Sequence, residues 1–420
     1  MEKALLVHMS ILRDNRESSA ESMAELCGLA KAAGAEVAGE IYQYRNEISP
    51  KYLIGKGKVS EIRQTAREKG VHLVIFDQNL TPIQQRNLEK DIKEKVIDRS
   101  QLILDIFSQR AQSREGKLQV ELAQLSYLRP RLLGRGQIMS RLGGGIGTRG
   151  PGETKLEVDR RKIQERITKI RKDIRKVQKH RAAQRKSRKE SPVPQISLVG
   201  YTNAGKSTLF NALCQEKTFT SSQLFATLDP VHRRISFPDG MYGFLSDTVG
   251  FIRLLPIELI TAFKATLEEV TETDCICHVV DINSPNSDSH VQAVESILAD
   301  LGTAEIPVLT IFNKIDQKDD PQGYLLRNRS TMPHRVYVSA LTGEGLDDLK
   351  ASLHQILFEN LRTYYLRIPK SKKHLLHSFP KWSVVLKRRE SKDYFELKIM
   401  ANPDHILNFV PFIDRGENRW

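Results

Sequence analysis

Cysteine is scarce in this sequence, and so are the hydrophobic features of secreted and membrane proteins. Four cysteines in 420 residues are too few for a disulfide framework and favour a reducing compartment. The chain has no run of about 18 apolar residues and no cleavable signal, and its first residues, MEKALLVHMS, have the pattern of a strand. We therefore expect a cytoplasmic protein without a membrane segment, and the length predicts two or three domains.

Two of the cysteines lie in the motif CICH, from Cys275 to His278, which invites comparison with a metal site. The motif belongs to the apolar run CICHVVD, however, where successive side chains of a strand would point to opposite faces. A zinc site needs about four ligands, and the sequence has no second ligand cluster nearby. The pattern favours packing of small buried side chains over metal binding.

Acidic residues are scarce in one stretch of the chain. Between Lys155 and Glu190 there are 16 Lys and Arg but five Asp and Glu, in a chain whose net charge is +14. A helix kept soluble by charged pairs needs acids to match its bases, which disfavours a merely solvated face. Such local basic character is typical of a site for a polyanion, most often nucleic acid.

The stretch from Gln195 to Thr208, QISLVGYTNAGKST, contains the pattern G-x-x-x-x-G-K-S between an apolar strand and a helix-compatible sequence. In such a loop the glycines let backbone N–H groups surround phosphates, the lysine adds a charge, and the serine hydroxyl ligates Mg²⁺. The positive end of the following helix favours the same anion. We therefore expect nucleotide contacts from Gly200, Tyr201, Thr202, Asn203, Ala204, Gly205, Lys206, Ser207 and Thr208.

Three further segments follow in the order that a GTPase requires, each after an apolar strand. LSDTVGF brings a carboxylate that holds Mg²⁺ through water and a glycine N–H near the γ-phosphate. VLTIFNKID ends in a carboxylate that matches the paired N–H donors of guanine and serves adenine badly, and VYVSAL offers a backbone N–H to the guanine oxygen. The pattern predicts a Mg²⁺-dependent GTPase that binds GTP and GDP through Asp247, Thr248, Val249, Gly250, Asn313, Lys314, Ile315, Asp316, Ser339, Ala340 and Leu341.

The position after the D-x-x-G glycine is Phe251, where the best-known GTPases have a glutamine that orients the attacking water. We therefore expect slow hydrolysis until a partner orders the site. Thr227 is the candidate switch threonine, whose hydroxyl joins that of Ser207 on Mg²⁺ when GTP is bound. The segment around it adds the candidate contacts Phe225, Ala226, Thr227, Leu228 and Asp229, and the predicted catalytic set is Lys206, Thr227, Gly250 and Asn203.

The predicted fold class is α/β, in four parts. Residues 1–98 alternate strand and helix patterns and predict a small domain with a mainly parallel sheet. Residues 191–360 form the predicted P-loop domain, a mainly parallel sheet with helices on both faces. Residues 361–420 predict a small α+β appendage with strands at 382–387 and 394–400 and a short helix at 404–409. For the aromatic residues of this appendage, core packing is favoured over stacking on bases.

Residues 99–190 predict an antiparallel helical hairpin that forms an arm. One helix is expected from Ser100 to Leu128, ending before Pro130. The other is expected around a heptad seam of Leu156, Ile163, Ile167, Ile170, Ile174 and Val177. Residues 134–154, between them, hold eight glycines and three arginines, which favours contact with RNA over a bare linker. The predicted apolar stripe of the first helix is Leu104, Phe107, Ala111, Leu118, Leu122 and Leu125.

Four stretches together resemble the HflX family of ribosome-associated GTPases, within the class that has a hydrophobic residue in place of the catalytic glutamine. They are RLGGGIGTRGPGETKLEVDRR (141–161), QLILDIFSQRAQSREGKLQVELAQLSYLRPRL (101–132), YLIGKGKVSEI (52–62) and LSDTVGFIRLLP (245–256). The resemblance covers roughly residues 1–360. It implies a bacterial-type factor that binds the large ribosomal subunit and its rRNA, directs the arm and glycine loop toward the peptidyl transferase region, and helps to split or rescue stalled ribosomes.

The resemblance also bears on ions and on alternative functions. Asn203 is similar to the asparagine that supports K⁺ binding in related GTPases, so equal turnover in Na⁺ and K⁺ would count against a K⁺ site. Secondary ATP use is implied by the family as well. Two other functions stay open: a nucleotide-driven rRNA-remodelling factor, and a GTP switch that acts on a membrane or protein partner. We expect a monomer.

Overall fold

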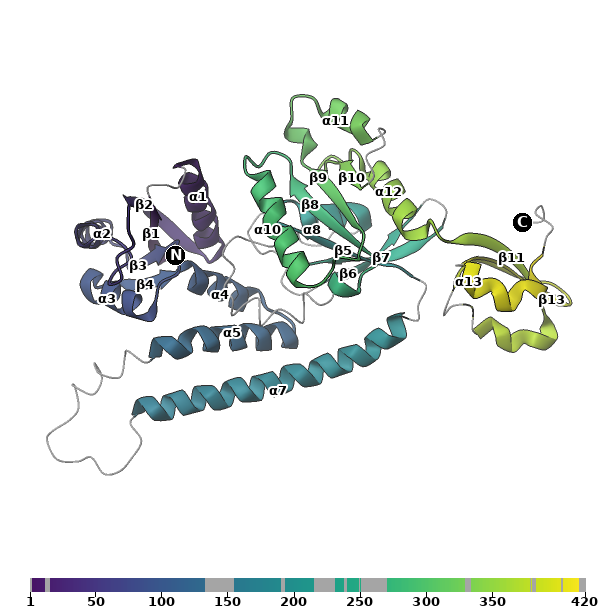
Figure 1. Ribbon diagram of the computed structural model, residues 1–420, viewed down its shortest axis with the longest axis horizontal. Helices are drawn as coiled ribbons and strands as arrows, with labels where there is room; N and C mark the ends of the chain where they lie inside the picture. The colour runs from purple at the N-terminus through teal and green to yellow at the C-terminus, as the bar shows by residue number, and fades with distance from the viewer. Residues whose placement is uncertain are drawn as a thin grey trace. The chain divides into compact units, whose positions relative to one another are not determined.

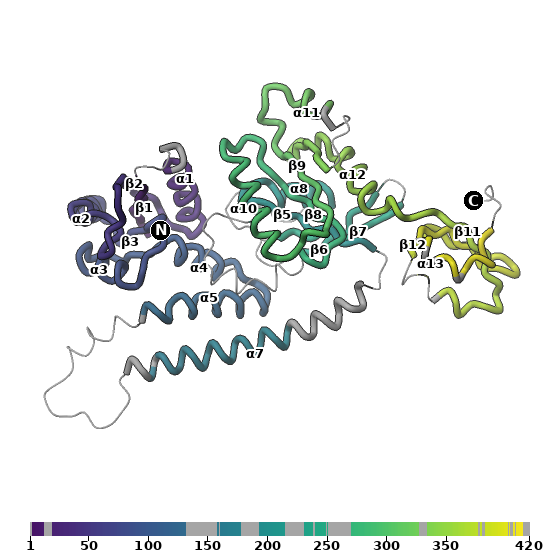
Figure 2. The backbone as a smooth tube through the Cα atoms, in the orientation of Figure 1, coloured from purple at the N-terminus to yellow at the C-terminus, as the bar shows by residue number. Residues whose placement is uncertain are grey.

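The computed structural model, shown in Figures 1 and 2, describes residues 2–11, 16–132, 155–189, 193–214, 231–237, 240–248, 250, 270–328, 334–377, 379, 383–401 and 403–414. The described residues divide into two compact units, of which the first ends at Val177 and the second begins at Gln178. Each unit is described by itself below.

The first unit begins with a four-stranded parallel sheet in the order β2-β1-β3-β4. Its elements are β1 (Glu2–Ile11), α1 (Arg16–Ala32), β2 (Ala35–Arg45), α2 (Lys56–Lys69), β3 (Leu73–Phe76), α3 (Pro82–Ile92) and β4 (Lys95–Asp98). The central strands β1 and β3 are almost continuously apolar and buried, as strands covered on both faces must be. The expected small α/β fold with a parallel sheet is confirmed.

The single helix expected from Ser100 to Leu128 is wrong, because the chain forms α4 (Arg99–Arg110) and α5 (Arg114–Leu132). Between them, the Ser113 hydroxyl accepts a hydrogen bond from the Gly116 N–H at 2.9 Å and thereby caps the start of α5. Pro130 does not end α5 but lies in its last turn. Two helical residues follow it. The backbone hydrogen bond that proline cannot donate is therefore lost near the helix end and not in the helix interior.

The buried face of α5 also differs from the predicted stripe. Val120, Ala123 and Tyr127 are buried, whereas the predicted residues Leu118, Leu122 and Leu125 are half-buried. The non-helical residues between α4 and α5 rotate the second helix relative to the first, so a single periodicity carried across the break gives the wrong face.

Asp98, at the end of β4, connects the arm to the sheet. One carboxylate oxygen accepts hydrogen bonds from the Tyr127 hydroxyl at 2.7 Å and from the Gln101 N–H at 2.9 Å. The other accepts from the Leu80 N–H at 3.0 Å and from the Arg131 guanidinium at 3.1 Å. Asp98 is fully buried, so these donors compensate the loss of its hydration. The C-terminal end of α5 is thereby fixed on the α/β domain.

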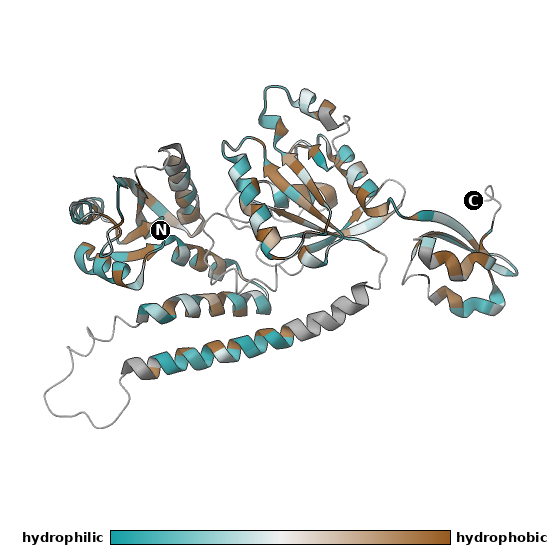
Figure 3. Cartoon of the chain, viewed as in Figure 1, coloured by the Kyte–Doolittle hydropathy of each residue, from teal (hydrophilic) through white to brown (hydrophobic). Residues whose placement is uncertain are grey.

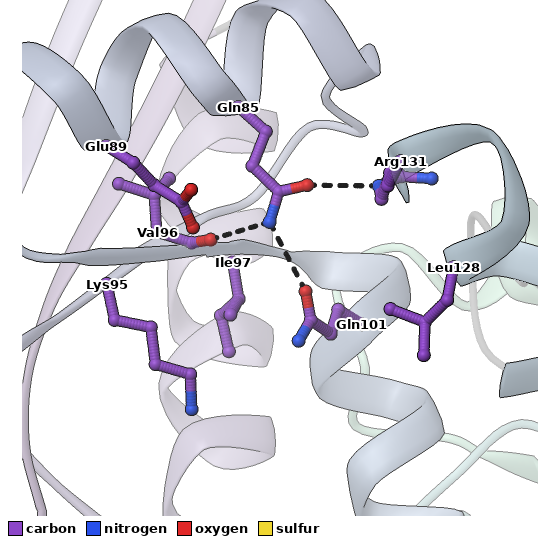
Figure 4. Close-up of a pocket in the computed structure, with 8 residues that line it drawn as sticks. All are labelled: Gln85, Glu89, Lys95, Val96, Ile97, Gln101, Leu128 and Arg131. Carbon is purple, nitrogen blue, oxygen red and sulfur yellow. Dashed lines mark hydrogen bonds between the residues drawn. The ribbon is translucent and has the colours of Figure 1, made fainter. Parts of the chain in front are cut away.

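A small pocket of about 170 Å³ lies beside this junction (Figure 4). The Gln85 amide at its centre donates to the Val96 carbonyl at 2.8 Å and to Gln101 at 3.4 Å, and its oxygen accepts from Arg131 at 3.0 Å. The hydrogen bonds of Gln85 therefore join α3 to β4, α4 and α5. The lining residues are Gln85, Glu89, Lys95, Val96, Ile97, Gln101, Leu128 and Arg131.

Helix α7 (Lys155–Lys189) runs antiparallel to α5 (Figure 1). The Arg166 guanidinium donates two hydrogen bonds to the Glu121 carboxylate at 2.6 and 2.7 Å, and Arg129 donates to Gln164 at 3.0 Å. Ile167, Ile170 and Ile174 of the predicted seam are buried. The expected helical hairpin is confirmed in these helices, and its predicted glycine-rich tip, 134–154, lies outside the described residues.

The second unit contains a six-stranded sheet in the order β10-β9-β8-β5-β7-β6, in which β6 is antiparallel to β7 and the other pairs are parallel. This is the predicted mainly parallel sheet of a P-loop domain. Its strands are β5 (Gln195–Gly200), β6 (Val231–Ser236), β7 (Tyr242–Asp247), β8 (Cys275–Asp281), β9 (Val308–Asn313) and β10 (Arg335–Tyr337). Its helices are α8 (Lys206–Cys214), η1 (Val270–Glu272), α10 (Ser287–Asp300), η2 (Ile315–Gln317), α11 (Pro321–Asn328) and α12 (Leu346–Phe358).

Figure 3 shows that the central strands of this sheet are largely hydrophobic, whereas α7 is largely hydrophilic. Cys275 and Cys277 are fully buried in the core on β8, with Ile196, Leu198 and Leu309 in the same cluster. Their burial in the apolar core agrees with the packing interpretation of CICH. In the described ranges, no three or more His, Cys, Asp or Glu side chains are grouped so that they could hold a metal ion. Across the same ranges, no helix has both the length and the apolar character that crossing a membrane requires.

The chain then forms a three-stranded antiparallel sheet in the order β11-β13-β12. Strand β11 was not predicted, and β12 extends further than expected. The helical segments pack on one face of this sheet through Leu366, Phe395 and Leu397. The elements are β11 (Arg362–Pro369), η3 (Lys370–His377), β12 (Ser383–Glu390), β13 (Tyr394–Ala401), α13 (Pro403–Ile406) and η5 (Leu407–Phe412).

Candidate nucleotide-binding site

The predicted phosphate loop connects the end of β5 to the start of α8, at the carboxyl edge of the parallel strands, where ligands bind in open α/β sheets. Its two glycines have positive φ angles, 149° at Gly200 and 93° at Gly205. A Cβ added to Gly200 would collide with the carbonyl oxygen of Val279 on β8, and one added to Gly205 would collide with the side-chain amide of Asn313. Both positions therefore require glycine for close approach as well as for backbone conformation.

Lys206 is the buried cation of this loop. Its Nζ donates hydrogen bonds to the carbonyl oxygens of Gly200 at 3.0 Å and Tyr201 at 2.8 Å. Burial lowers the pKa of Lys206 to about 8, although the nearby Asp247 carboxylate acts in the opposite direction. An ammonium held this way lies at the first residues of the loop, where a phosphate can replace the carbonyl oxygens as its partner.

The backbone of Gly250 approaches the same lysine. A Cβ built on Gly250 would lie 3.1 Å from Lys206 Nζ and 2.9 Å from the methyl group of Thr202. The D-x-x-G segment and the phosphate loop are thus side by side, and the contact of the Gly250 N–H with a γ-phosphate stays a prediction.

Oxygen ligands meet at Ser207 and Asp247. The Ser207 hydroxyl donates to Asp247 Oδ2 at 2.8 Å, although the two residues lie on α8 and β7. Hydroxyl and carboxylate oxygens are the donors that Mg²⁺ prefers, so this pair fits the ion that the phosphate loop implies. Thr248 does not point to the pair, because its buried hydroxyl donates to the Leu198 carbonyl at 2.6 Å.

Asn313 joins the phosphate loop to the predicted guanine segments. Its Nδ2 donates to the Ala204 carbonyl at 2.9 Å, and its Oδ1 accepts from the Ala340 N–H at 2.9 Å. The side chain is nearly fully buried, so both contacts are made away from water. Asn313 therefore acts as a brace between the two halves of the site.

Asp316 and Ser339 also lie together, because the Ser339 hydroxyl donates to Asp316 Oδ1 at 2.6 Å. Ile315 is buried, whereas Leu341 is 77% exposed. Lys314 has a left-handed backbone with φ of 69°. The structure thus brings the two segments predicted to bind guanine into one place.

Two contacts of the site were missed by sequence reasoning. Lys314 Nζ forms an ion pair of 2.6 Å with Asp281, the last residue of β8. Tyr201 stacks on His290 of α10, with ring centroids 3.8 Å apart and an interplanar angle of 10°. The position of Asp281 at the carboxyl end of a parallel strand was a usable signal, whereas nothing in the sequence pairs Tyr201 with His290.

The remaining predicted residues divide into two groups. Asn203 is exposed and has φ of 63°, and Thr208 is half-buried in the first turn of α8. The segment from Phe225 to Asp229, which includes the candidate switch residue Thr227, lies outside the described residues, and so do Val249 and Phe251.

Three family models match successive parts of the chain. Residues 20–108 match the model described as GTP-binding GTPase N-terminal, and residues 110–188 match the one described as GTP-binding GTPase Middle Region. Residues 195–314, which contain the phosphate loop and Asn313, match the one described as 50S ribosome-binding GTPase.

Individual relatives resemble the chain over most of its length. GTPase HflX of Caldanaerobacter subterraneus subsp. tengcongensis is 47% identical over 353 residues, which cover 84% of this chain and 81% of the relative. GTPase HflX of Escherichia coli (strain K12) is 42% identical over 392 residues, with 93% and 91% covered. Among solved structures, a crystal structure of SsGBP in complex with GDP matches with a TM-score of 0.51 at 26% identity, over 86% of this chain and 99% of that chain. The likeness therefore extends well beyond the nucleotide site.

Proposed function

The chain belongs to the HflX family of GTPases and hydrolyses GTP, and from this premise we propose that it acts on the large ribosomal subunit. GTP binding and hydrolysis would be coupled to the splitting or rescue of stalled ribosomes in the cytoplasm. The matched model for a 50S ribosome-binding GTPase supports this partner, and the splitting step rests on the family resemblance.

The observation that carries the proposal is the exposed face of α7. Among the described side chains, Lys162, Lys169, Arg171, Lys172 and Arg175 are exposed, and no acidic partner is found for any of them. Ile167, Ile170 and Ile174 of the same helix are buried, so these cations lie on its solvent-facing side. A row of unpaired cations fits the phosphate backbone of rRNA.

The nucleotide site supplies the chemistry of the proposal. Lys206 would exchange its carbonyl partners for β- and γ-phosphate oxygens, and the Gly250 N–H would contact the γ-phosphate. Ser207 and Asp247 would hold Mg²⁺, with Thr227 as a further ligand in the GTP state. When bound, the ion neutralises charge that develops on the transferred phosphoryl group. Asp316 would accept from guanine while Ser339 holds its other side.

Phe251 cannot orient the attacking water, since its side chain has no hydrogen-bonding group. We propose that the ribosome completes the site, so that hydrolysis is fast when the arm and the GTPase domain are engaged. Asn203 would support a K⁺ ion at the exposed rim of the phosphate loop.

The test is GTP turnover of the full-length protein with and without purified large subunits, alongside light scattering of intact ribosomes. We expect at least tenfold stimulation by large subunits, because supplying a missing catalytic group to a GTPase gives effects of 10³ or more. Scattering should fall in the presence of GTP. Lys206→Ala should abolish turnover, whereas Lys90→Ala, at an exposed position of α3, should not. Equal turnover in both conditions, together with no co-sedimentation with ribosomes, would contradict the proposal.

A further inference from the structure

The C-terminal sheet has one face that its helices do not cover. Alternate residues of a strand point to opposite sides, and Leu366, Ile368 and Leu397 point to the side on which η3, α13 and η5 pack. Their neighbours in each strand therefore lie on the second face. At one end of that face, Val384 and Met400 are buried in the core cluster of the GTPase domain. The rest of the face is free of such packing in the part of the chain that the structure describes.

The strand register defines what this second face carries. Tyr365 on β11 pairs with Lys398 on β13, which pairs with Lys387 on β12. In the next row, Arg367 pairs with Glu396, which pairs with Arg389, and the row after that contains Tyr394. We name this set the C-terminal basic face; it consists of Tyr365, Arg367, Lys387, Arg389, Tyr394 and Lys398.

Positive charge dominates the C-terminal basic face. Four of its residues are cations, and Glu396 is the one carboxylate in its described rows. Glu396 and Asp414 both interact with Arg367, at 3.4 and 3.6 Å, so the acids are engaged by one cation. Lys387 and Lys398 have no acidic partner among the described residues. Over residues 361–420 the sequence has 13 Lys and Arg against six Asp and Glu, so basic residues outnumber acidic ones throughout this part of the chain.

Two aromatic rings lie among these cations. Tyr394 is 40% exposed, whereas the adjacent Phe395 is 3% exposed and belongs to the core. Lys398 Nζ lies 5.7 Å from the ring centroid of Tyr365, and the Arg367 guanidinium lies 5.5 Å from that of Tyr394. Core packing, which the sequence favoured for the aromatics of this segment, therefore holds for Phe395 and not for Tyr394.

A sheet surface with one exposed ring, Tyr394, and one half-buried ring, Tyr365, between cations has the chemistry of single-stranded RNA recognition. Unpaired bases stack on aromatic side chains, while Lys and Arg contact the phosphates. Tyr365 and Tyr394 stand four residues apart along the pairing, about 14 Å at the usual strand rise, which a few nucleotides can span. An acidic protein segment bound to this face would use the cations but would give the rings of Tyr365 and Tyr394 no ring partner.

We propose that the C-terminal basic face binds a short unpaired stretch of RNA. Tyr365 and Tyr394 stack on bases, and Lys387, Arg389 and Lys398 contact phosphates. This site is separate from the arm, because it lies on the C-terminal sheet and uses other cations than those of α7. It assigns a role to the C-terminal residues that does not depend on ribosome splitting.

The test uses the full-length protein and a labelled RNA of about twelve nucleotides without self-pairing, with the same sequence in duplex form as comparison. Ultraviolet crosslinking followed by peptide mapping reports the site of contact, so that binding by the arm does not obscure it. We expect crosslinks in peptides that contain Tyr365 or Tyr394. The pair Lys387→Gln and Lys398→Gln should reduce their yield about tenfold and lower the salt slope of the contact by about 1.4.

The matched control removes two charges from the other side of the sheet, by Lys373→Gln and Arg388→Gln. Both residues are exposed, and Arg388 pairs with Leu397 on the helix-covered face. This control should leave the yield of crosslinks unchanged. Basal GTP turnover should be unchanged in every variant. Tyr394→Leu should lower the yield about tenfold, because it removes the ring on which one base stacks.

Three outcomes would overturn the proposal. One is an absence of crosslinks between residues 361 and 420. Another is equal loss in the two double variants, which would indicate general charge attraction. The third is a combination of two results: polyglutamate at matched charge displaces the RNA fully, and Tyr394→Leu does not change the crosslink yield. That combination would assign the face to an acidic protein partner.

Discussion

At the scale of single residues, His278 is coupled to the nucleotide site without being part of it. It lies on β8 in the core beside Lys206, and it is almost fully buried. Burial, with a further contribution from the positive charge of Lys206, lowers the pKa of His278 to about 4. The native protein therefore keeps this imidazole neutral at pH values where an unfolded chain protonates it.

This difference predicts how stability depends on pH. An unfolded histidine titrates near 6.5, so between about pH 6.5 and pH 4 the unfolded state binds a proton that the native state does not. Stability should therefore fall as the pH drops through this window, by up to about 3 kcal/mol from this residue. Urea unfolding of the nucleotide-free protein at about pH 7 and pH 4.5 measures the change.

The variant His278→Leu should show a smaller loss over the same interval, whatever its absolute stability. His374→Gln serves as the control, because His374 is exposed on η3 and should leave the pH dependence of the parent unchanged. Identical pH dependence in the parent and in His278→Leu would show that the buried imidazole does not set this window.

At the scale of elements, the break between α4 and α5 depends on a helix cap. The Ser113 hydroxyl accepts from the Gly116 N–H, which otherwise has no partner within the first turn of α5. Ser113→Ala should destabilise the first unit by about 1 kcal/mol, since that is the usual effect of removing an N-cap side chain. Thermal unfolding and hydrogen exchange of the first turn of α5 measure it.

Ser108 offers a matched control on the preceding helix. Its hydroxyl donates to the Asp105 carbonyl at 2.9 Å within α4, at an exposed position and not at a helix start. Ser108→Ala should change stability by less than about 0.5 kcal/mol, as exposed substitutions usually do. A larger effect for Ser108→Ala than for Ser113→Ala would contradict the assignment of the cap.

The same break shows where sequence reasoning succeeds and where it does not. The parallel strands and the site motifs were predictable, because buried apolar runs and fixed spacings such as the one from Gly200 to Ser207 are local signals. The break between α4 and α5 was not predicted, because two short helices and one long helix have nearly the same periodicity of apolar residues. The helix-capping residue Ser113 was the signal that was overlooked. Strand β11 was missed because it precedes basic, helix-like residues without a turn motif.

Within the candidate site, the limits are of another kind. Sequence reasoning found Asp316 and Ser339 separately, but their hydrogen bond results from register between β9 and β10, which no local pattern encodes. The brace made by Asn313 between Ala204 and Ala340 likewise joins residues 109 positions apart in one direction and 27 in the other. Motifs therefore identified the participants, and the fold determined their contacts.

At the scale of the whole molecule, two basic surfaces flank one nucleotide site in the sequence. The exposed cations of α7 precede the phosphate loop, and the C-terminal basic face follows the guanine segments. If a ribosome completes the catalytic site, as proposed, it can be held through parts of the chain that do not contact the nucleotide. If this is so, removal of cations from α7 should weaken ribosome binding without changing the basal chemistry.

The corresponding variant combines Lys169→Gln, Lys172→Gln and Arg175→Gln on α7. Each removed phosphate contact lowers the slope of log affinity against log salt by roughly 0.7 to 0.9, so the slope for large-subunit binding should fall by about 2. Basal GTP turnover should stay within about twofold of the parent, while stimulation by subunits requires higher subunit concentrations. Co-sedimentation across a salt series, with turnover measured in parallel, provides both readouts.

The control removes three exposed cations from the α/β domain instead, by Arg63→Gln, Arg67→Gln and Lys90→Gln. It changes the net charge by the same amount, so a long-range effect of charge alone would lower the salt slope equally in both triple variants. A decrease confined to the α7 variant identifies direct contacts along the helix. Equal slopes in the parent and the α7 variant would show instead that the cations of α7 are solvated in the complex, and the proposed attachment of the arm to rRNA would have to be withdrawn.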